Sequence, residues 1–103
     1  MAGPLDAEAV AAALVARPAW SSDGAALRRT VTCASFRAAV ALLDAVAEVA
    51  EEMDHHPDMT LRYRDLGLRL RSHDAGGITE RDLRLASRID ALVDSQAGAP
   101  PEA

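Results

Sequence analysis

One stretch of the chain, residues 35–71, decides the fold and reads SFRAAVALLDAVAEVAEEMDHHPDMTLRYRDLGLRLR. Its first half predicts a long amphipathic helix, because apolar side chains recur every three or four residues while charged ones fall elsewhere. The expected buried stripe consists of Phe36, Val40, Leu43, Val46 or Ala47, Ala50 and Met53. Ser35 is a suitable N-cap for this helix. Pro57 keeps His56 out of the helical region, so we expect the helix to end near Asp54 or His55.

The second half of the stretch predicts two antiparallel strands. Alternate residues are apolar in each run, namely Met59, Leu61 and Tyr63 in the first and Leu66, Leu68 and Leu70 in the second. The positions between them are polar or glycine, and most of them are arginine. This alternation is typical of an antiparallel sheet that has one covered face and one face in water.

Toward the N-terminus the sequence predicts another helix and another pair of strands. Residues 5–16 are rich in alanine and predict a helix that stops before an Arg-Pro pair. Residues 20–22 precede an Asp-Gly dipeptide, which is typical of a hairpin turn. Residues 27–33 are rich in β-branched side chains and predict a strand. Because Arg29 falls on the apolar face of that strand, we expect the face to be only partly buried or Arg29 to lie near an edge of the sheet.

Toward the C-terminus the sequence predicts a last helix after a Gly-Gly break. Residues 79–82 match the [ST]-x-x-[DE] capping pattern, and Leu85, Ile89 and Leu92 or Val93 form the expected buried stripe. The complete order is helix, two strands, helix, two strands, helix. This order predicts an α+β fold in which three helices pack on one face of a four-stranded antiparallel sheet. We expect residues 1–95 to form a single domain and residues 96–103 to form a flexible C-terminal tail.

Composition narrows the classes of function. The chain has 103 residues and a net charge of −5, which disfavours nucleic acid as a partner. All 11 basic residues are arginine, so a Schiff-base lysine is excluded. Cys33 is the single cysteine, which excludes an intrachain disulfide and the C-x-x-C motifs. No apolar run is long enough to span a membrane, and the N-terminus lacks the basic segment of a secretory signal. We therefore expect a protein of the bacterial cytoplasm with no membrane partner.

The histidines carry the candidate chemistry. His55 and His56 lie where the long helix ends, and the partial negative charge of a helix C-terminus favours a protonated imidazole. Glu51 precedes His55 by four residues, so we expect its carboxylate to contact that ring. His73 and Asp74 follow the last strand. If the strand pair returns toward the helix end, all three imidazoles of the chain converge, and imidazole is the side chain best suited to exchange protons near neutral pH.

Other interpretations of these residues stay open. A His-His pair before proline is typical of a polar loop, Asp82 is explained as a helix-cap partner, and Asp74 is explained as a surface charge. Three histidines and a carboxylate are also a possible zinc ligand set. However, neighbouring His55 and His56 do not share a face of a helix or strand, so we expect no metal site. A Ser-His-Asp hydrolase is disfavoured because Ser72 lacks the Gly-x-Ser-x-Gly elbow.

Several runs together carry a family resemblance: Ala50–Asp58 (AEEMDHHPD), Tyr63, Ser72–Asp82 (SHDAGGITERD), Leu85-Ala86 and Ile89-Asp90. In this combination the chain resembles the pterin-4a-carbinolamine dehydratases. The resemblance extends back through Phe36 and Arg29 to Trp20, so it covers nearly all of the expected domain. It implies a four-stranded antiparallel sheet with three helices, which is the fold that the residues predict, and it implies self-association as a dimer or tetramer.

The resemblance also implies an activity. Members of that family dehydrate 4a-hydroxytetrahydropterin, the product of aromatic amino-acid hydroxylases, to quinonoid dihydropterin and water. The pterin is the substrate, and no cofactor is implied. The resemblance therefore suggests a hydro-lyase with a functional link to an aromatic amino-acid hydroxylase.

Carried over residue by residue, the resemblance assigns catalysis to His55, His56, His73 and Glu51. It assigns contact with the pterin to Asp54, Ser72 and Asp74 together with the three histidines, and it assigns no residue to a metal. Within this set we expect His55 and His73 to transfer protons and His56 to hold the pterin. Glu51 is expected to set the charge and orientation of His55.

A second interpretation belongs to another class of function. Some relatives serve as binding proteins, either as a dimerisation cofactor of a transcription factor or as an assembly factor for a carbon-fixing enzyme. Such a role would use the faces of the helices rather than the histidines. Because the chain has all three histidines and Glu51, the sequence favours the enzyme.

Overall fold

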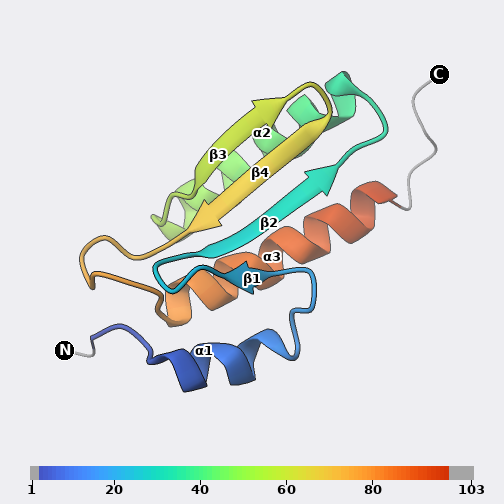
Figure 1. The fold of residues 1–103 in the computed structure, drawn as a ribbon. Coiled ribbons are helices and arrows are strands. Elements are labelled where there is room, and N and C mark those ends of the chain that lie inside the picture. The colour runs from blue at the N-terminus through green and yellow to red at the C-terminus, as the bar shows by residue number, and fades with distance from the viewer. Residues whose placement is uncertain (1–2, 98–103) are drawn as a thin grey trace.

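The secondary-structure elements follow one another in the order that the sequence predicts. A computed structural model describes residues 3–97 of the chain. The elements are α1 (Ala7–Leu14), β1 (Ser21–Ser22), β2 (Leu27–Thr32), α2 (Phe36–Met53), β3 (Asp58–Arg62), β4 (Asp65–Leu70) and α3 (Glu80–Ala97), as Figure 1 shows. The predicted α+β fold is confirmed.

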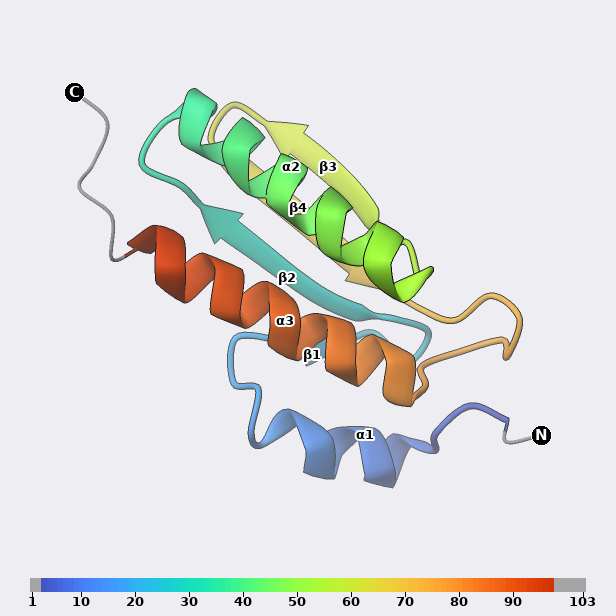
Figure 2. The ribbon, with the colours of Figure 1, turned by 180° about the vertical axis from the view of Figure 1, so that it is seen from behind.

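The four strands form one antiparallel sheet in the order β1-β2-β4-β3. The register sets Leu27 opposite Leu70 and Val31 opposite Leu66, so apolar side chains from neighbouring strands share one face. Figure 2 shows α2 and α3 side by side over that face, with α1 beside α3. The core lies between this helical layer and the sheet, where Leu27, Leu66 and Leu70 are fully buried.

Helix α2 begins as predicted and buries only part of the predicted stripe. The Ser35 side chain accepts a hydrogen bond from the Ala38 N–H at 3.0 Å, which confirms the expected N-cap. The buried residues of the helix are Ala38, Ala39, Leu42, Val46, Val49 and Ala50. Val46 and Ala50 thus match the predicted stripe, and Leu43 and Met53 pack against the core. Phe36, by contrast, is 52% exposed, and Val40 is only half-buried. Apolar residues cover more than one face of this alanine-rich helix, so their spacing alone did not show which face the sheet would bury.

The expectation for Arg29 is confirmed. Strand β1 pairs with β2 only at Leu27 and Arg28, so Arg29 lies where that side of β2 has no strand neighbour, and its side chain is half-buried. Its neighbours on the same face, Leu27 and Val31, are buried. Arg29 is tolerated on this face because its guanidinium donates a hydrogen bond to the Asp90 carboxylate of α3. The same Asp90 oxygen accepts a hydrogen bond from the Trp20 indole N–H at 2.8 Å. One carboxylate therefore satisfies two donors on the core side of the sheet.

The two ends of the described chain are attached to the domain. At the start, the Leu5 N–H donates to the Ile78 carbonyl at 2.8 Å. At the other end, α3 continues to Ala97, and the Gln96 amide donates to the Ala38 carbonyl at 2.8 Å. Residues 96 and 97 of the expected tail thus belong to the helix, and residues 98–103 lie outside the described residues. Between residues 3 and 97, no helix is long and apolar enough to cross a membrane.

Replacement of Asp90 by alanine tests the importance of this half-buried carboxylate. The variant removes the acceptor from two donors in a partly buried place, so we expect the free energy of unfolding to fall by about 1–3 kcal/mol. Urea denaturation followed by circular dichroism measures this change. Asp94→Ala, at an exposed position one turn further along α3, is the matched control and should unfold at the wild-type midpoint. An unchanged midpoint for Asp90→Ala would contradict this account of the core.

Candidate functional site

At the end of α2, two neighbouring histidines lie in different environments. Asp54 caps the helix in the left-handed conformation, with φ of 49°, and the His55 N–H closes back on the Ala50 carbonyl at 3.0 Å. Pro57 then holds the chain extended toward β3. As a result the His55 side chain is buried with 8% exposure, whereas the His56 side chain is 55% exposed. The predicted helix end is confirmed.

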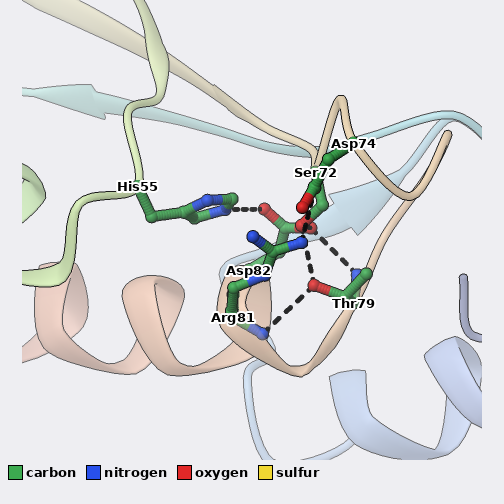
Figure 3. Close-up of polar contacts among 6 residues, drawn as sticks. All are labelled: His55, Ser72, Asp74, Thr79, Arg81 and Asp82. Carbon is green, nitrogen blue, oxygen red and sulfur yellow. Dashed lines mark hydrogen bonds and ion pairs between the residues drawn. The ribbon is translucent and has the colours of Figure 1, made fainter. Parts of the chain in front are cut away.

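His55 is hydrogen-bonded to a carboxylate of the last helix. Its Nε2 lies 2.6 Å from Oδ1 of Asp82, a fully buried residue in the first turn of α3 (Figure 3). These two residues are 27 positions apart in the sequence. The contact therefore joins the end of α2 to the beginning of α3.

The second oxygen of Asp82 serves the helix cap. Oδ2 accepts hydrogen bonds from the Thr79 N–H at 2.9 Å and from the Ser72 hydroxyl at 3.0 Å. The bond from Thr79 confirms the role of Asp82 as a cap partner, which sequence reasoning had offered as the whole explanation of this residue. The structure adds that the same carboxylate also holds His55.

Ser72 closes the loop that carries His73 and Asp74. Its N–H donates to the Gly77 carbonyl at 2.8 Å, and its hydroxyl lies 2.7 Å from the Thr79 hydroxyl. Gly76 completes the turn with φ of 74°, a conformation that favours glycine. The loop is therefore fixed at its base by the network around Asp82, while His73 and Asp74 are exposed.

Asp74 is engaged by a neighbour in the next helix. The Arg81 guanidinium donates to the Asp74 carboxylate at 2.6 Å, and this hydrogen bond holds the pKa of the carboxyl below its usual range. Asp74 is thus a carboxylate at neutral pH. Figure 3 shows the pair above the start of α3, close to the loop that Ser72 closes.

The prediction that Glu51 contacts His55 is wrong. Glu51 instead pairs with His56, whose Nε2 lies 2.5 Å from Oε2, and both side chains are largely exposed. The i and i+4 spacing predicts a contact only while the helix continues. Here the left-handed Asp54 ends the helix first and turns His55 toward the interior.

The structure brings together part of the predicted set. His55 and Ser72 meet through Asp82, and Glu51 meets His56. The convergence of all three imidazoles stays a prediction. Ser72, which directly precedes His73, belongs to the hydrogen-bond network that holds His55. Asp54 acts visibly as the cap of α2. Sequence reasoning missed Asp82 as the partner of His55, because its capping motif already explained it.

Metal and thiol chemistry have little support in the described part of the chain. No three His, Cys, Asp or Glu side chains gather there in a way that could hold a metal ion. Cys33 is buried at the end of β2, and burial raises the pKa of its thiol, which disfavours the reactive thiolate.

Known proteins are similar to this chain in sequence and in fold. The chain is 48% identical over 89 residues to a Thermomicrobium roseum protein provisionally named pterin-4-alpha-carbinolamine dehydratase, a match that covers 86% of this chain and 96% of that protein. A Nocardia farcinica protein with the same provisional name is also 48% identical, over 86% of this chain and 94% of its own length.

Two solved structures resemble the fold. The first, described as a transcriptional coactivator/pterin dehydratase from Brucella melitensis, superposes with a TM-score of 0.84 at 29% identity, over 88% of this chain and 99% of that one. The second, described as a pterin dehydratase-like RuBisCO assembly factor of the alpha-carboxysome, has a TM-score of 0.60 at 24% identity, over 72% of this chain and 86% of that one. The second likeness concerns the fold alone.

The match to a protein family spans residues 3–92, so it includes the histidines, the loop and the start of α3. The family is described as pterin 4 alpha carbinolamine dehydratase. The chain belongs to this family.

Proposed function

We propose that this protein dehydrates 4a-hydroxytetrahydropterin to quinonoid dihydropterin, with imidazoles as the acid and base. The observation that carries the proposal is the bond between His55 and the buried carboxylate of Asp82, next to the loop of His73, in a chain of this family. A carboxylate that holds an imidazole is a recurring arrangement in proton-transfer sites. The pterin is the substrate, and we propose no cofactor.

The reaction needs two proton transfers. The 4a-hydroxyl must receive a proton so that the C4a–O bond can break and release water, while the N5 lone pair forms the C4a=N5 double bond. The N5–H must then lose its proton. One group has to be protonated and another neutral at the same pH, which is easiest when they lie in different environments. His55 is buried against a carboxylate and His73 is exposed on a loop, so these two histidines suit the two tasks.

The remaining residues have supporting roles in this proposal. His56, which is exposed at the end of α2, holds the pterin, and Glu51 orients His56 rather than His55. Asp54 and Asp74 are exposed beside the histidines and are assigned to contacts with the pterin. The Ser72 hydroxyl is engaged by Thr79 and Asp82, so we assign it to holding the network rather than to touching the substrate.

A stopped assay with synthetic 4a-hydroxytetrahydropterin tests the proposed reaction. The wild type should accelerate dehydration, whereas His55→Gln should lose on the order of 10² or more of the catalysed rate. Glutamine keeps an N–H donor for Asp82 but cannot exchange protons, so the variant should fold. His73→Ala should fall to a similar extent. The same assay with a chelator should give the wild-type rate.

Two outcomes would contradict the proposal. Wild-type turnover by His55→Gln, His73→Ala and the double variant would remove the histidines from the reaction. Loss of activity on chelation, with recovery on adding zinc, would replace the acid–base mechanism with a metal-dependent one.

Glu51→Gln and His56→Ala test the division of roles. If the Glu51–His56 pair holds the pterin, both variants should raise KM while leaving kcat within a few-fold of wild type, because binding is weakened without loss of a proton-transfer group. Steady-state kinetics measure both constants. Glu52→Gln, an exposed carboxylate that pairs with Arg88 at 2.9 Å, is the control and should leave both unchanged. A large fall in kcat for Glu51→Gln at unchanged KM would refute this division.

A second candidate function is binding or assembly without catalysis. The observation that favours it is the apolar side of α2 that the core does not bury, where Phe36 is 52% exposed and Val40 is half-buried. The two solved structures described as a coactivator and as an assembly factor show that such descriptions occur among proteins of this fold. The histidine variants above separate the two functions, because a protein that only binds would not need the imidazoles.

We also propose self-association as a dimer or tetramer, with the exposed apolar side of α2 at a contact. A chain of 103 residues buries a limited share of its own apolar surface, so burial between copies adds stability. Light scattering at micromolar concentration should give a dimer or tetramer, and Phe36→Ser should shift the mass toward the monomer. Val15→Ser, at an 82% exposed position of another helix end, should not. A wild-type monomer would refute the proposal.

A further inference from the structure

We propose that Asp82 is a positioning residue that fixes the tautomer of His55 and leaves Nδ1 as the nitrogen that exchanges protons. The catalytic consequence rests on the proposed function. The tautomer itself does not, because it follows from the hydrogen bonds within the protein.

Each donor around Asp82 has an acceptor. The Thr79 N–H can only donate, and its acceptor is Oδ2 at 2.9 Å. The Ser72 hydroxyl also reaches Oδ2, at 3.0 Å. The Thr79 hydroxyl accepts from the Arg81 N–H at 3.3 Å and is free to donate its own proton to the Ser72 oxygen at 2.7 Å. Each donor proton in this hydrogen-bond network then has one acceptor, and Oδ2 of Asp82 accepts two of these protons.

The charge of the Asp82 carboxylate decides which residue carries the proton shared with His55. Asp82 is fully buried, and it lies in the first turn of α3, where the partial positive charge of a helix N-terminus stabilises an anion. An ionised carboxylate has no proton to give. Since Oδ1 lies 2.6 Å from Nε2 of His55, the proton between them must belong to the imidazole. The neutral ring is therefore the Nε2–H tautomer.

The other ring nitrogen of His55, Nδ1, has no hydrogen-bond partner within residues 3–97. Among these residues, the single fully buried side-chain nitrogen or oxygen without a partner is Nε of Arg71. Nδ1 is therefore not fully buried. It presents a lone pair when the ring is neutral and an N–H when the ring is protonated, so it can both take and give a proton.

Asp82→Asn gives a sharp test, because an amide cannot replace both oxygens. The Thr79 N–H and the Ser72 hydroxyl require an acceptor, so the amide oxygen should take the place of Oδ2. The amide NH2 group then points at Nε2 of His55, and the ring must accept there and carry its proton on Nδ1. The helix cap is kept and the tautomer is inverted, a change that abolishes most of the activity in other carboxylate–histidine pairs.

The measurement is the 15N spectrum of the His55 imidazole, recorded through its ring protons at a pH where the ring is neutral. The wild type should show the Nε2–H pattern, and Asp82→Asn should show the Nδ1–H pattern together with a fall in turnover on the order of 10² or more. Asp6→Asn is the matched control, because Asp6 caps α1 through the Ala9 N–H at 2.8 Å and contacts no histidine. It should keep the wild-type tautomer and rate.

The outcomes separate this inference from the proposed function. An Nδ1–H pattern in the wild type would overturn the inference without any variant, so the test stands even if Asp82→Asn fails to fold. An unchanged Nε2–H pattern in a folded Asp82→Asn protein would also overturn it. Inversion of the tautomer in a protein that never dehydrates pterin would support the inference and reject the proposed function.

Discussion

The carboxylate of Asp82 is the constraint on which the candidate site depends. It is fully buried, it shares a hydrogen bond with His55 after α2, and it accepts hydrogen bonds from Ser72 after β4 and from Thr79 at the start of α3. A buried charge is tolerated only when its partners are in place, because an unpaired one costs several kcal/mol. The start of the last helix, the base of the loop and the orientation of His55 are therefore set by the same interaction.

Helix α3 carries a second carboxylate that joins distant segments, eight residues after Asp82. Asp90 accepts hydrogen bonds from Arg29 and Trp20, while Leu85, Ala86 and Ile89 between the two acids are fully buried. The face of α3 that meets the core thus has an acidic group near each end of an apolar centre. Apolar burial supplies most of the stability, and the two carboxylates make the position of the helix specific. A precisely placed α3 in turn holds His55 steady while His56 and His73 stay exposed.

Much of this could be predicted from the sequence, because the signals were local. Alternation in residues 59–71 predicts the strands, Ser35 and Pro57 predict the ends of α2, and the motif at 79–82 predicts the cap of α3. The contacts that the sequence did not reveal join distant segments. Arg29 is satisfied by Asp90, which lies 61 residues away, and the partner of His55 is Asp82 rather than the nearby Glu51. Spacing along the chain does not reveal such pairs, and a residue with one local explanation can hide a second role.

The central claim is that a pterin binds beside the pair formed by His55 and Asp82. The most direct measurement is an NMR titration of the isotopically labelled protein with 7,8-dihydrobiopterin, a pterin without the 4a-hydroxyl group that the reaction removes. The account predicts shifts in the ring resonances of His55, His56 and His73 and in the amide signals of residues 72–77. All of these shifts should follow one binding curve with a single dissociation constant. Shifts confined to α1 or to the open face of the sheet, with the imidazole resonances unmoved, would contradict it.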